Sequence, residues 1–293
     1  MYDFHGEYKR LQTKFEDYLN NYVRELKTTP KILGDSMAYS LTLGGKRVRP
    51  VLLLATAELL SVADEDALPF ALALEMVHTY SLIHDDLPAM DNDDFRRGKP
   101  SNHKVFGEGN AVLAGDALLN TAYQICLKEC LKGQSQVSAA SLLCECAGID
   151  GMIAGQSADL YYQEFSAEQS EENLEYIYEN KTGKLLQAPT GIASILAENK
   201  YYLQLSEYAK MLGLLFQITD DILDVEGDFS QLGKTIGKDA QENKFTSIRY
   251  YTLEGAKIRA EVYAEKCCTL LEGIDADTSF LKDLVFYVKN RKN

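Results

Sequence analysis

The chain has 293 residues and a formal net charge of −14, with 46% hydrophobic and 25% charged residues. That length can bury a sizeable core in one domain, and the composition is ordinary for a globular protein. The negative charge argues against nonspecific binding to nucleic acid or to an anionic membrane surface, since both are polyanions. The N-terminal stretch Met1 to Tyr8 is polar, and no apolar run approaches the roughly 18 residues of a membrane span. We expect a cytoplasmic protein with no membrane span.

Helix signals run along the whole chain. Only six residues are proline, and apolar residues recur every three or four positions, as in the stripe Phe70, Leu74 and Val77. Alternating strand patterns are scarce, and no Pro/Gly/Ser linker or solenoid repeat divides the chain. The sequence therefore predicts an all-α fold and a single domain over residues 1–293.

The six cysteines lack any CxxC pair. They are Cys126, Cys130, Cys144, Cys146, Cys267 and Cys268. We expect buried small hydrophobic residues in a reduced protein, with structural zinc as the less favoured alternative.

The first notable motif in chain order is basic. The segment Gly44–Pro50 reads GGKRVRP and places Lys46 and Arg49 three positions apart, next to two glycines. Glycine permits close backbone approach, and Arg and Lys suit phosphate recognition. A basic island is more often a solubilising feature, but the glycine pair favours an anion site here.

An acidic cluster, with Asp85, Asp86 and Asp91 in a DDxxxxD pattern, follows. Carboxylates next to apolar helix residues are costly unless they are paired or bind metal. Pro88 removes a helical hydrogen bond, so we expect the chain to turn there and bring Asp91 back toward Asp85. Arg96 and Arg97 come directly after this cluster, in the polar interruption Asn92–Asn110.

A second acidic cluster, DDILD, contains Asp220, Asp221 and Asp224. On a helix Asp220 and Asp224 lie about 40° apart, with Asp221 at the edge of the same face. The alternative is a solvated acidic face, but two such clusters in apolar surroundings favour metal. Ligation by carboxylates alone indicates Mg²⁺ or Mn²⁺. The polar interruption Gly227–Lys244, which carries Lys234, Lys238 and Lys244, comes next.

Taken together, these motifs resemble the trans-prenyl diphosphate synthase family, specifically its bacterial farnesyl diphosphate synthase type. The resemblance extends over nearly the whole chain, and the order and spacing of the two Asp-rich motifs are its most specific part. The other matching segments are GGKRVRP, AVLAGDALL, GQSADL, KTGKLL, FQITDD, LGKTIGKD and FYVKNRKN. Asn92 departs from the Asp found in some relatives, outside the metal triad.

The resemblance implies a helical isoprenoid-synthase bundle around a deep central cavity, usually as a homodimer. It implies that isopentenyl diphosphate and an allylic diphosphate are the substrates, and that three Mg²⁺ ions bridge the aspartates to the allylic diphosphate, with Mn²⁺ as a possible substitute. The implied metal ligands are Asp85, Asp86, Asp91, Asp220, Asp221 and Asp224. The implied allylic diphosphate contacts are Arg96, Lys181, Lys244 and Lys234. The implied isopentenyl diphosphate contacts are Lys46, Arg49, His78 and Arg97.

The implied reaction begins with ionisation of the allylic diphosphate, followed by attack of the isopentenyl double bond and loss of a proton. Thr182 and Gln217 match residues that stabilise the developing cation. No side-chain nucleophile is needed, but water must be excluded, and closure of the Gly227–Lys244 loop is our hypothesis for this.

Product length is the finer question. In the bacterial farnesyl type an aromatic residue such as Tyr80, followed here by Ser81, resembles a floor that stops growth at fifteen carbons. Plain core packing is the alternative for Tyr80, and a geranylgeranyl product is the main alternative for the enzyme. A class I terpene cyclase and an inert helical subunit are less favoured, because the second motif is DDILD and both aspartate motifs are intact.

Overall fold

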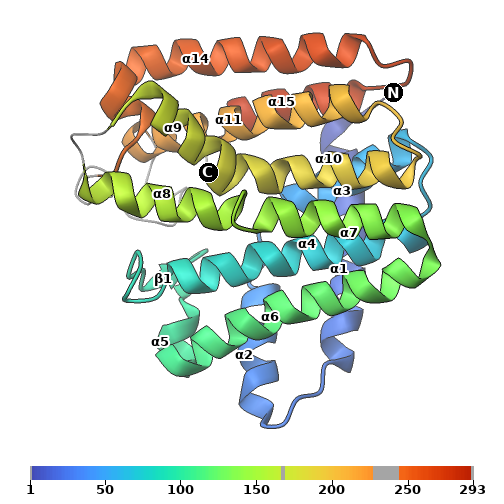
Figure 1. Cartoon of the computed structure of the whole chain (residues 1–293), viewed down its shortest axis with the longest axis vertical. Coiled ribbons are helices and arrows are strands. Elements are labelled where there is room, and N and C mark those ends of the chain that lie inside the picture. Colours follow the sequence, from blue (N-terminus) through green and yellow to red (C-terminus); the bar gives the residue numbers. More distant parts are fainter. Residues whose placement is uncertain (1, 166–168, 227–243, 292–293) are drawn as a thin grey trace.

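Helices make up nearly all of the structure, a computed structural model that describes residues 2–165, 169–226 and 244–291 (Figure 1). The elements are α1 (Phe4–Glu25), α2 (Lys31–Thr42), α3 (Val48–Leu59), α4 (Asp64–Asp85), β1 (Phe95–Arg96), β2 (Lys99–Pro100), α5 (Asn102–Phe106), α6 (Glu108–Glu129), η1 (Cys130–Lys132), α7 (Gln134–Ala147), α8 (Met152–Glu164), α9 (Glu171–Ile177), the π-helix η3 (Tyr178–Gly183), α10 (Lys184–Leu196), α11 (Tyr202–Glu226), α14 (Ser247–Glu272) and α15 (Ser279–Lys289). The all-α prediction is confirmed. Lys234 and the loop proposed to close over the site lie outside the described residues, apart from Lys244.

The long helices lie across the molecule in stacked rows, while α1 and α2 cross them (Figure 1). Helix α4 packs against α6 and α3, and α10 packs against α7, α11 and α3. The central helices are buried on several faces, as in α3, where residues Val51, Leu52, Leu53 and Leu54 are each 0% exposed. The sequence of such a helix has apolar residues on every face rather than along one stripe. Their buried residues belong to one continuous hydrophobic cluster.

A short hairpin, β1–β2, with a two-residue turn follows α4. Arg96 pairs with Lys99, and the two connecting residues Arg97 and Gly98 both have positive φ, of 53° and 73°. Positive φ at both central residues is typical of the tight type I′ hairpin turn. The hairpin sets the backbone positions of Arg96 and Arg97, and the strand patterns were too short to be seen in the sequence.

The segment Gln134–Glu164 is long and apolar enough to span a membrane by length and composition, and 39% of its most apolar 18-residue window is buried. This corrects the expectation that no apolar stretch reaches that length. The segment is divided into α7 and α8 at Gly148–Gly151, and α7 packs against α10. One such segment is weak evidence for a span, and its packing is that of a core helix.

The cysteines divide into three exposure classes. Cys126, Cys146 and Cys267 are buried, Cys130 and Cys268 are half-buried, and Cys144 is exposed. The prediction of buried cysteines is therefore confirmed for three positions and wrong for Cys144, which lies on the outer face of α7.

Candidate metal and diphosphate site

The first acidic cluster lies where α4 ends. Pro88 cannot donate a helical hydrogen bond, and the backbone instead turns, with the N–H of Leu87 bonded to the carbonyl of His84 at 3.1 Å. The N–H of Asp91 then donates to the carbonyl of Asp85 at 2.8 Å. The turn expected at Pro88 is present, and it returns the backbone of Asp91 to Asp85.

Asp85 is in an environment that disfavours its own charge. Burial raises its pKa to about 6; Lys181 lowers the pKa, while Asp91 and Asp86 raise it further. A cation among these carboxylates would relieve both the desolvation cost and the repulsion. An all-oxygen donor set of this kind fits a hard divalent ion such as Mg²⁺.

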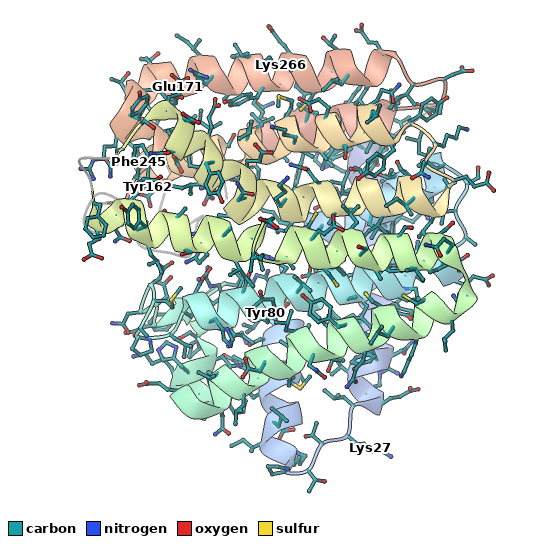
Figure 2. The ribbon with its side chains drawn as sticks, in the orientation of Figure 1. Lys27, Tyr80, Tyr162, Glu171, Phe245 and Lys266 are labelled. Atoms are coloured by element: carbon teal, nitrogen blue, oxygen red, sulfur yellow. The ribbon has the colours of Figure 1, made fainter. Side chains whose placement is uncertain are left out.

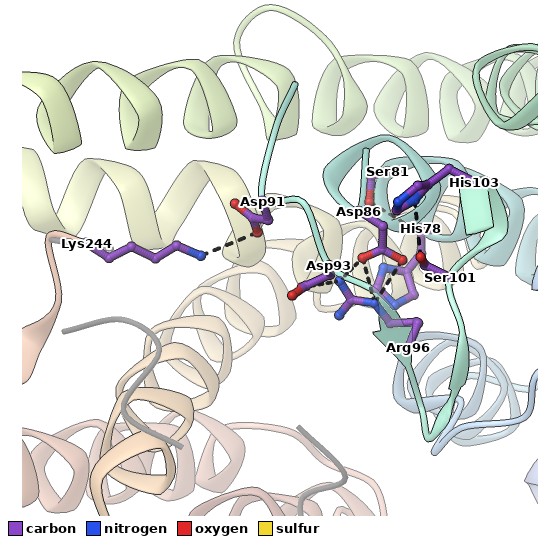
Figure 3. Close-up of polar contacts among 9 residues, drawn as sticks. All are labelled: His78, Ser81, Asp86, Asp91, Asp93, Arg96, Ser101, His103 and Lys244. Carbon is purple, nitrogen blue, oxygen red and sulfur yellow. Dashed lines mark hydrogen bonds and ion pairs between the residues drawn. The ribbon is translucent and has the colours of Figure 1, made fainter. Parts of the chain in front are cut away.

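Asp86 points to protein donors (Figure 3). It is 2% exposed and accepts hydrogen bonds from Nε of Arg96, at 3.0 Å, and from Nη2. Arg96 also forms an ion pair with Asp93 at 3.4 Å. Burial raises the pKa of Asp86, although the Arg96 bonds oppose this. Asp86 thus fixes Arg96 beside the cluster.

Two lysines face the first cluster from distant parts of the chain. Nζ of Lys244, just before α14, is 3.4 Å from Oδ2 of Asp91 (Figure 3). Nζ of Lys181, on the π-helix η3, donates to Oδ2 of Asp159 at 2.5 Å. Burial alone would lower the pKa of Lys181, but Asp159 and Asp85 raise it on balance. Both amines are thus paired with carboxylates near the C-terminal end of α4.

Close backbone contact places the π-helix. A Cβ added to Gly155 of α8 would lie 2.0 Å from the backbone nitrogen of Lys181, and one added to Gly213 of α11 would lie 2.6 Å from Cα of Gly183. Glycine at both positions lets α8 and α11 approach η3 directly. π-Helical turns often occur at functional sites, and this one presents Lys181 and Thr182.

The second acidic cluster lies near the end of α11, as predicted, but its carboxylates do not all face one way. Asp221 is 3% exposed, and its Oδ2 accepts hydrogen bonds from the N–H and hydroxyl of Ser247, each at 2.7 Å, and from the hydroxyl of Tyr178. Asp221 therefore joins α11 to α14 and η3. Asp224 is 5% exposed, and the Asp220 side chain is 38% exposed.

Neighbouring residues of η3 connect the two clusters. Lys181 interacts electrostatically with Asp85, and the hydroxyl of Thr182 donates to Oε1 of Gln217 at 2.8 Å. The amide of Gln217 donates in turn to Asp221 at 3.3 Å. The structure therefore brings Thr182 and Gln217 together between the acidic clusters.

A separate basic group lies around the segment Gly44–Pro50. Arg49 is 3.4 Å from Nε2 of His78, and Nη1 of Arg97 donates to the carbonyl of Gly44. Burial lowers the pKa of Arg49 to about 10, with Glu75 and Arg97 as smaller influences. Burial, and then Arg49 and Arg97, lower the pKa of His78 as well.

Positively charged neighbours thus help to lower the pKa of both Arg49 and His78, and an anion bound here would relieve this repulsion. Lys46 lies in the same segment, where its carbonyl accepts a hydrogen bond from Tyr8 at 2.8 Å. Arg47 has a different part: it is 4% exposed and forms an ion pair with Glu75 at 2.6 Å that holds the segment on α4.

Tyr80 and Ser81 occupy the last turns of α4. Tyr80 lies between α4 and α6 (Figure 2) and is 6% exposed; its hydroxyl has no hydrogen-bond partner among the described residues. Its ring meets that of His84 edge to face at 5.7 Å. The hydroxyl of Ser81 bonds back to the carbonyl of His78 at 2.9 Å. Tyr80 thus contributes the volume of its buried ring, and the hydroxyl of Ser81 is hydrogen-bonded within α4.

In the part of the chain that is described, no three His, Cys, Asp or Glu side chains lie close enough to hold one ion. Mg²⁺ usually takes only one or two carboxylates and completes its coordination with water and phosphate oxygens. Sequence reasoning missed Asp159, Ser247 and Arg291, which hold Lys181, Asp221 and Asp220. Asp159 and Arg291 fall within the segments GQSADL and FYVKNRKN, the only signal that could have found them.

Comparison with known proteins agrees with this site. Residues 30–269 match the family model described as polyprenyl synthetase. The chain is 45% identical to the farnesyl diphosphate synthase of Geobacillus stearothermophilus over 91% of this chain and 90% of that one. It is 43% identical to a chloroplastic geranylgeranyl pyrophosphate synthase of Capsicum annuum, over 90% of this chain and 73% of that one.

Among solved structures, a geranyltransferase of Helicobacter pylori complexed with magnesium and isoprenyl diphosphate superposes with a TM-score of 0.86. The two are 30% identical, and the match covers 99% of this chain and 97% of that one. The chain belongs to the polyprenyl synthetase family.

Proposed function

We propose that this protein is a farnesyl diphosphate synthase, a prenyltransferase that condenses isopentenyl diphosphate head-to-tail with dimethylallyl or geranyl diphosphate. The carrying observation is that adjacent residues of η3 serve both acidic clusters: Lys181 interacts with Asp85, and Thr182 bonds to Gln217, which in turn bonds to Asp221. An ionising diphosphate needs this combination of metal ligands, amines and hydroxyl or amide dipoles around one point. The farnesyl diphosphate synthase of Geobacillus stearothermophilus, at 45% identity, supports the activity.

Magnesium would be held by the six aspartates of the two clusters, three ions per site, with Mn²⁺ as a substitute. Asp86 and Asp221, only 2% and 3% exposed, are enclosed by their donors Arg96 and Ser247 and suit a supporting part. Asp85, Asp91 and Asp220 are more exposed and suit direct ligation. When bound, the metal supplies charge neutralisation to the departing diphosphate. The Helicobacter pylori geranyltransferase, which is complexed with magnesium, supports magnesium as the metal.

The chain's own cations would bind the allylic diphosphate. Arg96 forms an ion pair with Asp86, Lys181 with Asp159 and Lys244 with Asp91, so a carboxylate partner holds each cation in place. Lys234 completes this proposed set but lies outside the described residues. Fixed donors of this kind stabilise the charge that develops as the C–O bond breaks.

Isopentenyl diphosphate would bind at the basic group of Lys46, Arg49, His78 and Arg97. A dianion there would satisfy guanidinium groups that otherwise repel one another, including a buried Arg49 Nε without a partner among the described residues. Thr182 and Gln217 would stabilise the allylic cation, and the released diphosphate would take the proton. Neither step uses a side-chain nucleophile.

Product length gives a second candidate, since the Capsicum annuum geranylgeranyl pyrophosphate synthase is 43% identical. We favour the fifteen-carbon product because the buried ring of Tyr80 lies one to two turns before Asp85, where it would stop the growing chain. Ser81 would border the same floor. The deep cavity itself stays a prediction.

We further infer a single domain over residues 1–293, a cytoplasmic protein and a homodimer. One continuous hydrophobic cluster supports the single domain. The exposed apolar side chains Val112, Leu113 and Leu127 on α6 support association with a second copy.

Incubation with labelled isopentenyl diphosphate, geranyl diphosphate and Mg²⁺ tests the proposed activity. Farnesyl diphosphate should be the product by chromatography after phosphatase treatment. A hydrocarbon formed without consuming isopentenyl diphosphate would indicate a cyclase instead, and no product at all would indicate an inert subunit.

A further inference from the structure

The last described residue of the chain reaches into the second acidic cluster. Arg291 follows α15, and its Nη2 donates to Oδ1 of Asp220 at 3.2 Å and to the carbonyl of Phe216 at 2.8 Å. These bonds join the C-terminal end to the motif FQITDDILD, 71 residues earlier in the chain. Arg291 is therefore part of the immediate surroundings of Asp220.

The guanidinium of Arg291 is confined rather than loosely placed. Its carbon lies 3.9 Å from the centre of the Phe216 ring, and only 6% of the side chain is exposed. Its Nε is buried without a partner among the described residues. A stacked, desolvated guanidinium of this kind makes stronger and more directional bonds than an exposed one.

The segment that carries Arg291 is itself anchored. Tyr287 and Phe280 of α15 pack against Phe4 and Tyr8 of α1, with ring centres 5.1 to 6.3 Å apart. The guanidinium is thus fixed by α15 on one side and by Phe216 on the other.

Asp220 is more exposed than the other two aspartates of its cluster. Asp221 is buried and accepts hydrogen bonds from Ser247 and Tyr178, whereas the Asp220 side chain, at the start of the same cluster, is 38% exposed. Repulsion from Asp221 and Asp224 would otherwise drive its carboxylate toward solvent. The bond from Arg291 to Oδ1 opposes this and favours one orientation of the carboxylate.

We propose that Arg291 is a positioning residue that holds Asp220 in the orientation in which it binds a divalent cation together with diphosphate. This inference rests on the proposed function and deepens it, because it gives the C-terminal end a part in assembling the metal site. Arg291 itself touches neither metal nor substrate in this account.

Binding of Mn²⁺ in the presence of inorganic diphosphate, followed by electron paramagnetic resonance, tests the proposal without turnover. Because a hydrogen bond to a charged group is worth about 1.5–3 kcal/mol, Arg291→Gln should weaken Mn²⁺ binding at least ~10-fold. Arg291→Lys should recover part of the loss, because it restores the charge but not the planar stack. Phe216→Leu removes the ring beneath the guanidinium and should weaken binding in the same direction.

Lys289→Gln is the matched control. Lys289 belongs to the same C-terminal segment, but its amine pairs with Glu261 at 2.5 Å, away from the aspartates. Mn²⁺ binding by this variant should equal that of the wild type. Unchanged or tighter binding in Arg291→Gln would overturn the proposal, and tighter binding would mean that Arg291 competes with the metal.

Two further measurements keep the outcomes distinct. Circular dichroism reports whether Arg291→Gln folds. If Arg291→Gln does not fold, Phe216→Leu is the deciding variant. Mn²⁺ binding by Phe216→Leu that equals binding by the wild type then overturns the proposal. Turnover by the wild type tests the proposed function separately, since loss of Mn²⁺ binding in the variants can be measured whether or not that reaction is the right one.

Discussion

Lys244 and Asp91 lie 153 residues apart in the chain, yet Nζ of the lysine is 3.4 Å from Oδ2 of the aspartate. The lysine follows the second acidic cluster and the aspartate ends the first. Their contact places the residues just before α14 near the C-terminal end of α4. It is there that we propose a diphosphate meets both metal and amine.

Asp85→Asn should abolish most of the activity. The amide keeps the shape but loses the charge that holds a cation, and removing one preorganised electrostatic group costs ~10²–10³ in kcat. Steady-state rates with geranyl and isopentenyl diphosphate measure this. Asp94→Asn is the control, because Asp94 lies in the segment that follows α4 and pairs with Lys104 at 2.7 Å on the surface. Equal losses in both variants would contradict the assignment.

Gly45→Ala should raise the KM for isopentenyl diphosphate. A Cβ at Gly45 would lie 2.6 Å from the guanidinium carbon of Arg97, at a φ of +125° that side chains rarely adopt. Gly44→Ala is the control that separates backbone strain from displacement of Arg97. Gly44 also has a positive φ, +84°, but a Cβ added there would meet no atom within 4 Å. Both variants should lose about 1 kcal/mol of stability from strain, whereas only Gly45→Ala should bind isopentenyl diphosphate more weakly. Equal KM values would argue that Arg97 is not a contact.

Tyr80→Ala should lengthen the products, because it removes the buried ring between α4 and α6. Tyr80→Phe is the control: it keeps the ring and deletes a hydroxyl that has no partner among the described residues, so product length should not change. Chromatography of the dephosphorylated products measures both. If Tyr80→Ala still stopped at fifteen carbons, Tyr80 would be a packing residue only.

His78 should make the folded protein less stable in mild acid. Burial and the neighbouring arginines depress its pKa below 6.5 in the folded state. The unfolded state therefore binds a proton first, and stability present above pH ~6.5 is lost as the pH falls, by at most ~1.4 kcal/mol per pH unit. Urea unfolding between pH 7.5 and 5 should show a shallower loss in His78→Gln. Identical slopes would mean that the imidazole titrates normally.

Local pattern was enough to predict the helices and the acidic clusters. The spacing of Asp220 and Asp224 follows from helix geometry alone, and the turn at Pro88 follows from its missing N–H, which is why Asp91 returns to Asp85. Such features depend on neighbours within a few residues. The same holds for the apolar periodicity that defines the core helices.

Features that depend on distant contacts could not be predicted in this way. Asp221 was expected to face the same way as Asp220, but it bonds to Ser247, 26 residues later. Arg291 and Asp159 take their parts only through tertiary packing, against Phe216 and Lys181. No periodicity or composition in one sequence encodes those pairings.

Metal dependence tests the central claim most directly. The enzyme is stripped of divalent ions with a chelator, and condensation of geranyl with isopentenyl diphosphate is then followed while Mg²⁺ is titrated back. We predict no turnover in the stripped enzyme, full recovery on addition of Mg²⁺ or Mn²⁺, and farnesyl diphosphate as the product. Undiminished turnover without any divalent ion would contradict the account.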